Sequence, residues 1–348
     1  MIWHHVSPGE QRTALLLGGG LREFHVHRPA APDGVGALHW ARVVARVPAM
    51  AGAFLALAEA EAFLPDTEGG AGLTVGDGVV VRITRAGQGG KGPRASARVS
   101  EAERALGAPG APRLLRAGPT PLEELRAAFA EEELRVGAFP DALEAEIEAL
   151  ALAQVDLPGG MRATISPTPA LTAIDLDGGA ATAARAQKAS AQFAANREAI
   201  PALARQIRLR NLSGAILIDF AGMPAKRRAA LGPVLAESLA ADRVACRLAG
   251  FSALGFAELI RPRLRPPLHE VLRGPHAAGL AALRQAAAEA LLAPGRRLAL
   301  RAAPGVVAAL QADGAALAAY AQGATYKLVL RSDPNLGACG WILETDHG

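Results

Sequence analysis

The chain has 348 residues, of which 51% are hydrophobic and 4% aromatic, and its net charge is +4. This length suffices for two or three domains with separate cores. No apolar run reaches the roughly 18 residues that span a bilayer, and the N-terminus does not read as a signal peptide, so we expect a cytoplasmic protein. Two cysteines, Cys246 and Cys339, exclude a disulfide framework and a four-thiolate zinc site.

The charge is distributed unevenly along the chain. Residues 101–155 hold eleven acidic side chains against five arginines, which leaves the rest of the chain at about +10. Basic surface outside one acidic segment suits a polyanionic partner such as a nucleic acid.

The first third of the chain reads as strands. Residues 10–27 predict a hairpin that turns at the glycines 18–20, because no helix and no Lys-Ser/Thr pair follow these glycines as a phosphate loop would require. From 37 to 100, short alternating segments separated by Gly, Pro and Asp predict a small barrel of the OB type, whose face binds single-stranded nucleic acid.

Two aromatic residues and a basic loop give this barrel a candidate function. Phe54 and Phe63 fall in it, and the loop "RAGQGGKGPR" carries Arg85, Lys91 and Arg94. Aromatic rings stack on bases and cations pair with phosphates, as single-stranded RNA or DNA binding requires. The alternative is that both Phe side chains belong to the barrel core and the loop is only solvated.

The remainder alternates between helices and strands. Residues 101–155 predict acidic helices, and the segment after Gly159-Gly160 predicts strands that end on Asp175 and Asp177. An α/β layer follows, and the last 75 residues predict a small α+β module of helix, strand, helix, strand, strand. The expected elements of the α/β layer are a helix over 196–211, a strand over 215–219, a helix over 223–243, a strand over 244–251 and a helix over 254–272, broken at its prolines.

Two apolar strands in the middle of the chain each deliver a carboxylate. "LTAIDLDGG" contains Asp175 and "AILIDFAGM" contains Asp219, with one helical connection between them. A strand–helix–strand crossover normally places its strands side by side, so the two carboxylates are expected at the same sheet edge. Paired oxygen ligands suit Mg²⁺, which can activate water for attack on a phosphodiester. The alternative is a pair of strand-terminal aspartates that only cap their strands.

Several collinear blocks resemble the ribonuclease E/G family. The run "NLSGAILIDFAGM…GFSALGFAELIRPR" is close to the catalytic region of the ribonuclease G branch, and "ALTAIDLDGG" and "NREAIPALARQIRLRN" match upstream in the same order. Residues 10–29 are similar to the opening strands of the family, 41–65 to its OB domain, and "GQGGKGP" to the basic loop there.

The resemblance implies roles for individual residues. Asp175 and Asp219 would hold the catalytic Mg²⁺, with Asp177 at a position where the family usually has an Asn that orients the first aspartate. Phe54, Phe63 and Lys91 would line the RNA path. Ala245 stands where the family has a basic residue that contacts RNA, and Arg243 or Arg247 would take over that contact. Arg85 is a further candidate RNA contact.

The resemblance also implies a multi-domain α/β and α+β fold. Its parts would be an RNase H-like subdomain (1–36 and 101–165), an inserted OB-fold barrel (37–100), a DNase I-like catalytic α/β layer (166–272) and a small C-terminal α+β domain (273–348). Only about 75 residues separate Ser100 from Asp175, so the 5′-sensor domain of the family is expected to be missing. "RGPHAAGLAAL" stands where the Cys-Pro-x-Cys zinc link should be, so a monomer or weak homodimer is expected, and His269 and His276 nearby read as surface residues.

Together these points predict a Mg²⁺-dependent endoribonuclease. It would cleave single-stranded RNA, in ribosomal RNA processing or mRNA turnover, and leave 5′-phosphate and 3′-hydroxyl ends. The rival is an RNA-binding protein that has kept the scaffold and lost turnover. A nucleotide enzyme built on "LLLGGGL" is a third, weaker alternative.

Overall fold

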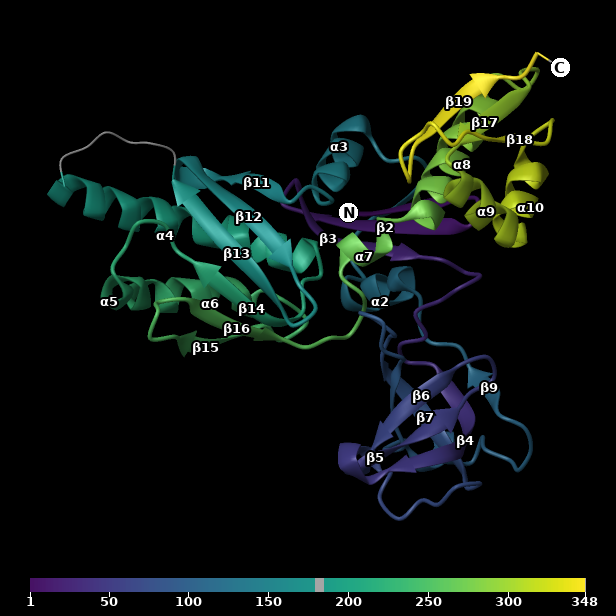
Figure 1. The fold of residues 1–348 in the computed structure, drawn as a ribbon, viewed down its shortest axis with the longest axis horizontal. Coiled ribbons are helices and arrows are strands. Elements are labelled where there is room, and N and C mark those ends of the chain that lie inside the picture. Colours follow the sequence, from purple (N-terminus) through teal and green to yellow (C-terminus); the bar gives the residue numbers. More distant parts are fainter. Residues whose placement is uncertain (179–184, 348) are drawn as a thin grey trace. The chain divides into compact units, whose positions relative to one another are not determined.

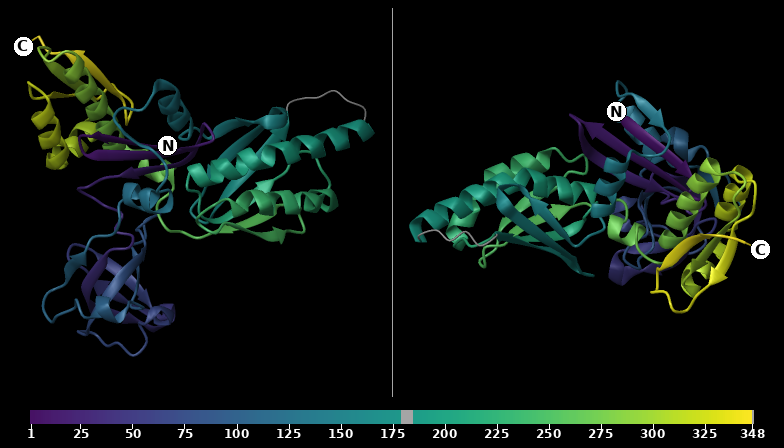
Figure 2. Two further views of the ribbon diagram at one scale, coloured as in Figure 1. Left: turned by 180° about the vertical axis from the view of Figure 1, so that it is seen from behind. Right: turned by 90° about the horizontal axis from the view of Figure 1, so that it is seen from above.

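The computed structural model describes residues 1–178 and 185–347, which fold into two compact units (Figure 1, Figure 2). The first unit contains Met1–Gly34, Gly118–Glu144 and His269–Gly348, and the second contains Val35–Ala117 and Ala145–Leu268. Among the described residues, no helix is long and apolar enough to cross a membrane.

The first unit begins with a four-stranded sheet in the order β10-β1-β2-β3. The predicted hairpin is confirmed, and its turn uses Gly18 and Gly19 with φ of 59° and 81°, values that favour glycine. The elements around this sheet are β1 (Ile2–Ser7), β2 (Glu10–Leu17), β3 (Gly20–His27), α2 (Pro121–Ala128), β10 (Leu134–Val136) and α3 (Asp141–Ala149).

The C-terminal part of this unit has the predicted order of elements. A three-stranded sheet, β18-β17-β19, packs on three helices through a core that includes Leu283, Leu300 and Leu310. The single helix predicted between the first two strands of this module is divided in two, because the side chain of Asp313 accepts a hydrogen bond from the Ala316 amide and starts a new helix. The elements are α7 (Leu268–Val271), α8 (Pro275–Leu292), β17 (Leu298–Ala302), α9 (Pro304–Ala312), α10 (Gly314–Gly323), β18 (Val329–Ser332) and β19 (Trp341–Thr345).

The second unit contains the predicted barrel. Strand β4 pairs with both β5 and β7, and the chain of pairings β5-β6-β8-β7 closes the barrel around a core of small and branched side chains. A closed, OB-like barrel of five strands is therefore confirmed. Its elements are β4 (Leu38–Val47), β5 (Gly52–Ala56), β6 (Glu61–Pro65), β7 (Gly78–Arg85) and β8 (Arg94–Ser96), followed by α1 (Glu101–Arg104) and β9 (Arg113–Arg116).

An α/β layer forms the rest of the second unit. Its six-stranded sheet has the order β11-β12-β13-β14-β16-β15, with β13 and β14 parallel and joined through α4. Helices α4 and α6 share one core with this sheet (Figure 2). The elements are β11 (Gln154–Leu157), β12 (Met161–Pro167), β13 (Leu171–Gly178), α4 (Arg185–Leu209), β14 (Gly214–Asp219), α5 (Ala225–Arg228), α6 (Gly232–Ala240), β15 (Arg247–Phe251) and β16 (Ala257–Arg261).

Three predicted elements are wrong in type or extent. The helix expected over 254–272 contains strand β16, in which Ala257 and Leu259 are buried while Glu258 and Ile260 alternate to the other face. The acidic segment expected to be wholly helical includes strands β9 and β10, which pair with β4 and β1. The helix expected over 223–243 is broken into α5 and α6, and strand β15 begins after Ala245, whose φ of 35° interrupts the extended backbone.

A buried ion pair fixes strand β16 in the sheet. The Arg261 guanidinium donates to Asp242 at 2.7 Å and to the Leu212 carbonyl at 3.1 Å, and both charged side chains are almost fully buried. Arg261 falls in the helix predicted over 254–272, but in the structure it ends strand β16 and forms this ion pair. An unpaired charge at this depth would be strongly destabilising.

Candidate active site and nucleic-acid interface

The carboxylates of Asp175 and Asp219 lie at matching positions on two neighbouring strands. Strands β13 and β14 run parallel, and their register pairs Asp175 with Asp219 directly. Register partners in adjacent strands project to the same side of a sheet. The crossover therefore brings these two residues together, as the spacing predicted.

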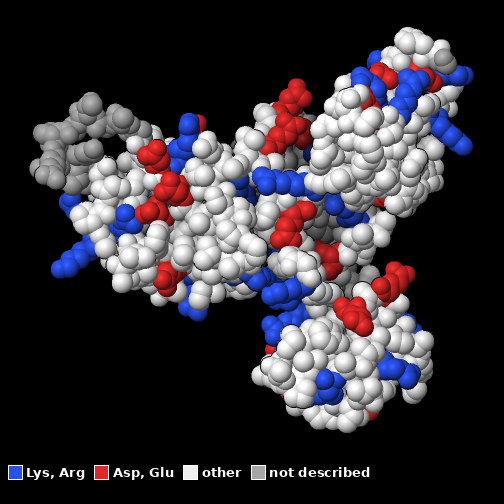
Figure 3. All heavy atoms as spheres, viewed as in Figure 1, with Lys and Arg blue, Asp and Glu red and all other residues white. Residues whose placement is uncertain are grey.

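Strand alternation directs these side chains away from the core. On β13, Ile174 and Leu176 are buried, whereas Asp175 and Asp177 project to the opposite, exposed face. On β14, Ile218 is fully buried and Asp219 is half-buried. In Figure 3, acidic atoms (red) gather on the part of the surface where β13 ends.

Asp177 extends the acidic group along β13. It lies two residues beyond Asp175 on the same face, about 6.6 Å further along the strand. Its register partner is Arg162, whose guanidinium donates to Asp156 at 2.7 Å. Asp177 therefore lies beside Arg162 of strand β12, which flanks β13 on the side away from β14. It does not lie between the two paired aspartates.

Among the described residues, Arg228 is the cation that forms an ion pair with Asp219. Arg228, at the end of α5, donates from Nη1 to Oδ1 of Asp219 at 2.5 Å. No role was predicted for Arg228 from the sequence, where it is the last of three consecutive basic residues, 226–228, in the helix predicted over 223–243. The short distance along the chain between Asp219 and this run was the available signal, because a turn after a strand can return a side chain to the strand end.

Asn196 connects helix α4 to the backbone that follows Asp219. It is fully buried, and its Nδ2 donates to the carbonyls of Gln192 at 2.7 Å and Ala221 at 3.2 Å. The Oδ1 atom of Asn196 is buried without a hydrogen-bond partner in the described part of the chain. This side chain therefore holds the loop after β14 against the helix that joins the two aspartate strands.

The donor set fits a small, hard divalent cation. Mg²⁺ is commonly bound by one or two carboxylates, with waters and phosphate oxygens completing its octahedron, and two register-paired aspartates on an accessible face meet that need. No group of three or more His, Cys, Asp or Glu side chains with metal-binding geometry occurs among the residues that the structure describes. A zinc site of the structural type is therefore not formed by those residues.

The barrel carries an aromatic pair on its outer face. Phe54 on β5 and Phe63 on β6 are direct cross-strand partners, with ring centroids 5.5 Å apart in an edge-on arrangement. Their neighbours Leu55 and Leu64 are fully buried in the barrel core, while both Phe side chains are only half-buried. The interpretation of both Phe residues as barrel core is therefore wrong, because strand alternation directs them outward.

Two arginines stand next to this aromatic pair. Arg94 is the register partner of Phe63 on one side and of Arg85 on the other, and its Cζ lies 5.8 Å from the Phe63 ring centroid. Burial, followed by the positive charges of Arg94 and Arg263, lowers the pKa of Arg85. Like charges placed opposite each other destabilise a sheet, and a bound phosphate would relieve that repulsion.

Lys91 lies at the tip of the basic loop. Gln88 and Lys91 pair across Gly89 and Gly90, whose φ values of 59° and 71° define a two-residue hairpin turn. The Lys91 side chain is exposed. The loop is therefore solvent-exposed, and it also forms a defined turn with the Lys91 ammonium group at its tip.

Arg243 lies in the turn ahead of β15 and is exposed. Strand β16 stands between β15 and β14, so the sheet order does not bring Arg243 to the strands of the aspartates. His269 and His276 belong to the first unit and the aspartates to the second, and His276 pairs with Asp313 at 2.9 Å.

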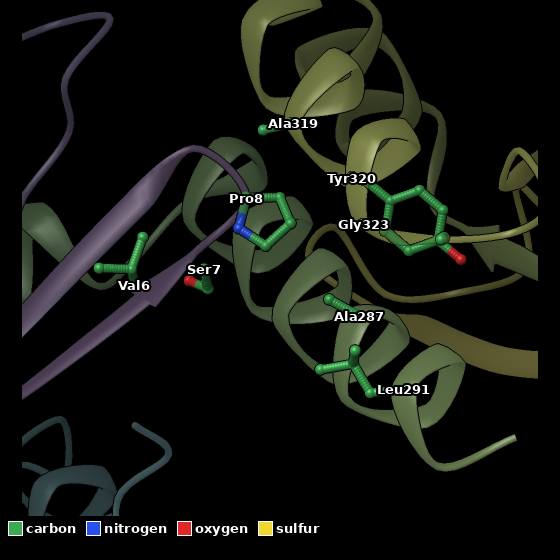
Figure 4. Close-up of a pocket in the computed structure, with 9 residues that line it drawn as sticks. Val6, Ser7, Pro8, Ala287, Leu291, Ala319, Tyr320 and Gly323 are labelled. Carbon is green, nitrogen blue, oxygen red and sulfur yellow. The ribbon is translucent and has the colours of Figure 1, made fainter. Parts of the chain in front are cut away.

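A hollow in the first unit has no catalytic chemistry. It measures about 230 Å³ and lies between the β1–β2 turn and helices α8 and α10 (Figure 4). Its lining side chains are apolar apart from the hydroxyls of Ser7 and Tyr320, and burial raises the pKa of Tyr320. No carboxylate, imidazole or thiol belongs to this lining.

The structure thus combines an α/β layer that carries two register-paired aspartates with an OB-like barrel, and the α/β layer is the part that resembles known proteins. Residues 138–264 match the model of the Ribonuclease E/G family. This segment, which contains Asp175, Asp219 and Arg228, is therefore similar to the ribonuclease E/G family.

Individual relatives cover the same part of the chain. Ribonuclease G of Escherichia coli (strain K12) is 40% identical over 132 residues, which are 37% of this chain and 27% of that protein. Ribonuclease E of the same organism is 39% identical over 129 residues, which are 37% of this chain and 12% of that protein. Ribonuclease E of Nostoc sp. is 35% identical over 119 residues, or 17% of its length. The match therefore spans between 12% and 27% of the length of these relatives.

Proposed function

We propose that this chain is an endoribonuclease that cleaves single-stranded RNA with a divalent cation, Mg²⁺, held by Asp175 and Asp219. The observation that carries the proposal is the register pairing of these two residues on parallel strands within the segment that matches the Ribonuclease E/G family. The relatives named ribonucleases support the reaction class.

Each part of the chain has a defined task in this proposal. The carboxylates hold the cation, which when bound lowers the pKa of a water and stabilises the oxyanions of an in-line attack. Cleavage of this kind would leave a 5′-phosphate and a 3′-hydroxyl. Phe54 and Phe63 stack on bases while Arg85, Arg94 and Lys91 pair with phosphates, which selects unpaired RNA because bases in a duplex are already stacked.

The proposal includes cleavage that does not depend on the 5′ end. About 75 residues lie between Ser100 and Asp175, where the family would place a 5′-sensor domain. The substrate class we propose is ribosomal RNA precursors or mRNA with exposed single-stranded segments, and the compartment is the cytoplasm.

A second candidate function is RNA binding without turnover. Asp177 stands where the family usually has an Asn, and Arg228 already neutralises Asp219. A third carboxylate near Asp175 and an internal counter-cation on Asp219 are both consistent with a site that no longer binds a metal.

Cleavage of an internally labelled, AU-rich single-stranded RNA separates these candidates. The RNA is prepared with a 5′-monophosphate or a 5′-hydroxyl and incubated with Mg²⁺ or with EDTA. The endoribonuclease predicts internal cuts only with Mg²⁺, at equal rates on both 5′ ends. Binding of the RNA by the barrel with no cut on several sequences would favour the second candidate.

A further inference from the structure

The guanidinium of Arg228 lies where a cation on Asp219 would lie. It donates to Oδ1 of Asp219 at 2.5 Å, and it is the single ion-pair partner that Asp219 has in the described part of the chain. The side chain of Arg228 is 15% exposed, so it is packed into the structure and does not extend into solvent.

Two backbone carbonyls orient this guanidinium. Nε of Arg228 donates to the Met223 carbonyl at 2.8 Å, and Nη1 approaches the Gly255 carbonyl at 3.4 Å. Gly255 has a φ of 89°, and a Cβ there would lie 3.2 Å from Cδ of Arg228 and 3.1 Å from Ala225. The absence of a side chain at Gly255 therefore gives Arg228 its place beside Asp219.

The two neighbouring cations do not share this arrangement. Lys226 and Arg227 belong to the same short helix, and both side chains are exposed. The contact with Asp219 is thus specific to Arg228 and is not a property of the basic run as a whole.

We propose that Arg228 is a latch on the aspartate pair: its guanidinium occupies Asp219 in the metal-free protein, and a divalent cation must displace it to bind. This inference rests on the proposed function, because it takes Asp175 and Asp219 as the metal ligands. Without a cation, two carboxylates in register repel each other, and Arg228 neutralises one of them. A bound divalent cation would itself neutralise both carboxylates, so the Arg228–Asp219 ion pair would no longer be needed. The positive charge of Arg228 would then repel the cation and weaken its binding.

The latch sets the cation concentration at which the site fills. Removing the competing charge should tighten metal binding by roughly 5- to 10-fold, since a partly exposed charge at contact distance is worth about 1 kcal/mol after screening. A residue that only supports the loop between Met223 and Gly255 would have the opposite effect, because its loss would misplace Asp219 and weaken metal binding.

Mn²⁺ binding to the protein without RNA tests the latch. The free ion is measured by electron paramagnetic resonance during titration of the wild type, Arg228→Gln and Arg227→Ala. The Gln variant removes the charge but keeps a hydrogen-bond donor for the Met223 carbonyl, and Arg227→Ala removes an exposed charge of the same helix. We expect Arg228→Gln to bind Mn²⁺ roughly 5- to 10-fold tighter than the wild type, and Arg227→Ala to stay within about twofold.

Four further measurements keep the result unambiguous. Asp175→Asn should abolish Mn²⁺ binding in both the wild-type and the Arg228→Gln background, which assigns the signal to the aspartate pair. The Mg²⁺ concentration for half-maximal RNA cleavage should fall by the same factor in Arg228→Gln. Thermal unfolding checks that the variant is folded, and Arg228→Lys, which keeps the charge, should bind Mn²⁺ like the wild type.

The outcomes separate the latch from the proposed function. Suppose that Mn²⁺ binding depends on Asp175, but that Arg228→Gln binds Mn²⁺ no more tightly than Arg227→Ala does. The latch is then wrong and the metal site stands. If neither the wild type nor Arg228→Gln shows binding that depends on Asp175, the latch and the metal site of the proposed function are both wrong.

Discussion

Single residues in this protein acquire their functional position from strand alternation. Asp175 and Asp219 belong to apolar strands, and in each the preceding isoleucine enters the core while the aspartate turns to the other face. Phe54 and Phe63 are placed outside the barrel core by the same rule. A shift of one residue in either strand pair would bury two charges or two exposed rings.

Loss of one aromatic ring should weaken RNA binding by the barrel. We expect Phe63→Ala to lower the affinity for a fluorescein-labelled, AU-rich single strand in EDTA by about 10-fold or more, because one stacked base is worth about 1–3 kcal/mol. Phe63→Tyr retains the stacking surface and should stay within about threefold of the wild type. Fluorescence anisotropy measures both affinities, and equal affinity for the Ala variant and the wild type would contradict the assignment.

His5 should make the first unit sensitive to acid. Burial first, and then the charges of Arg12 and Arg284, lower the pKa of His5 to about 4, and its Nδ1 lies 2.8 Å from an Nη2 of Arg12 that can only donate. The unfolded chain, with a pKa near 6.5, therefore takes up the proton first, and stability falls as the pH is lowered from about 6.5 to about 4.

Urea unfolding of a His5→Gln variant tests this sensitivity. Gln offers an acceptor to Arg12 but does not titrate. The wild type should lose about 1 kcal/mol more of its free energy of unfolding between pH 7 and pH 5 than the variant, after allowance for the partial exposure of His5. Parallel pH profiles for the two proteins would show that His5 is not protonated on unfolding.

At the scale of elements, tertiary pairing decides where the sequence signal was ambiguous. Strand β10 has three residues and forms because Leu134 pairs with Ile2 of β1 and packs against the same small core. Strand β16 is inserted between β14 and β15 by its pairings and by the buried Arg261. Both segments have an apolar pattern that is compatible with a helix. Each forms a strand instead because a neighbouring strand, β1 or β14, offers backbone groups for pairing, and the local sequence does not reveal such a neighbour.

Gly52 on strand β5 makes room for the aromatic pair. A Cβ at this position would lie 2.4 Å from Cζ of Phe63 and 2.6 Å from the Leu64 carbonyl oxygen. We expect Gly52→Ala to destabilise the protein by about 1–3 kcal/mol and to weaken RNA binding, because the Phe63 ring must move. Gly20→Ala is the matched control, since a Cβ on that strand glycine would meet nothing within 4 Å. Differential scanning calorimetry and anisotropy measure the two effects, and equal behaviour of both variants would refute the clash.

At the scale of the whole molecule, the elements with a clear local sequence pattern were the most predictable ones. The hairpin at the N-terminus, the OB-like barrel, the parallel pair β13–β14 and the order of the C-terminal elements follow from turn glycines, alternation and crossover topology. The division into two units, each assembled from distant segments, requires contacts that no local pattern contains.

The pairing of Asp175 with Asp219 was predictable from the sequence, but the contact of Arg228 with Asp219 was not. Asp175 and Asp219 follow apolar runs that mark strand ends, whereas the contact of Arg228 with Asp219 depends on the turn of the chain after β14 and on space beside Gly255. Such a contact is a property of loop geometry, and a run of three basic residues does not indicate which of them turns inward.

The most direct measurement of the central claim compares single-turnover RNA cleavage in Mg²⁺ by the wild type, Asp175→Asn, Asp219→Asn and Asp156→Asn. Asp156 is an exposed acid of the same sheet, so it controls for the loss of one negative charge. We predict that each of the first two substitutions lowers the cleavage rate by at least about 100-fold while RNA affinity stays within about threefold, and that Asp156→Asn retains activity. Cleavage at the wild-type rate by either Asp175→Asn or Asp219→Asn would contradict the assignment of this pair as the metal ligands of an endoribonuclease.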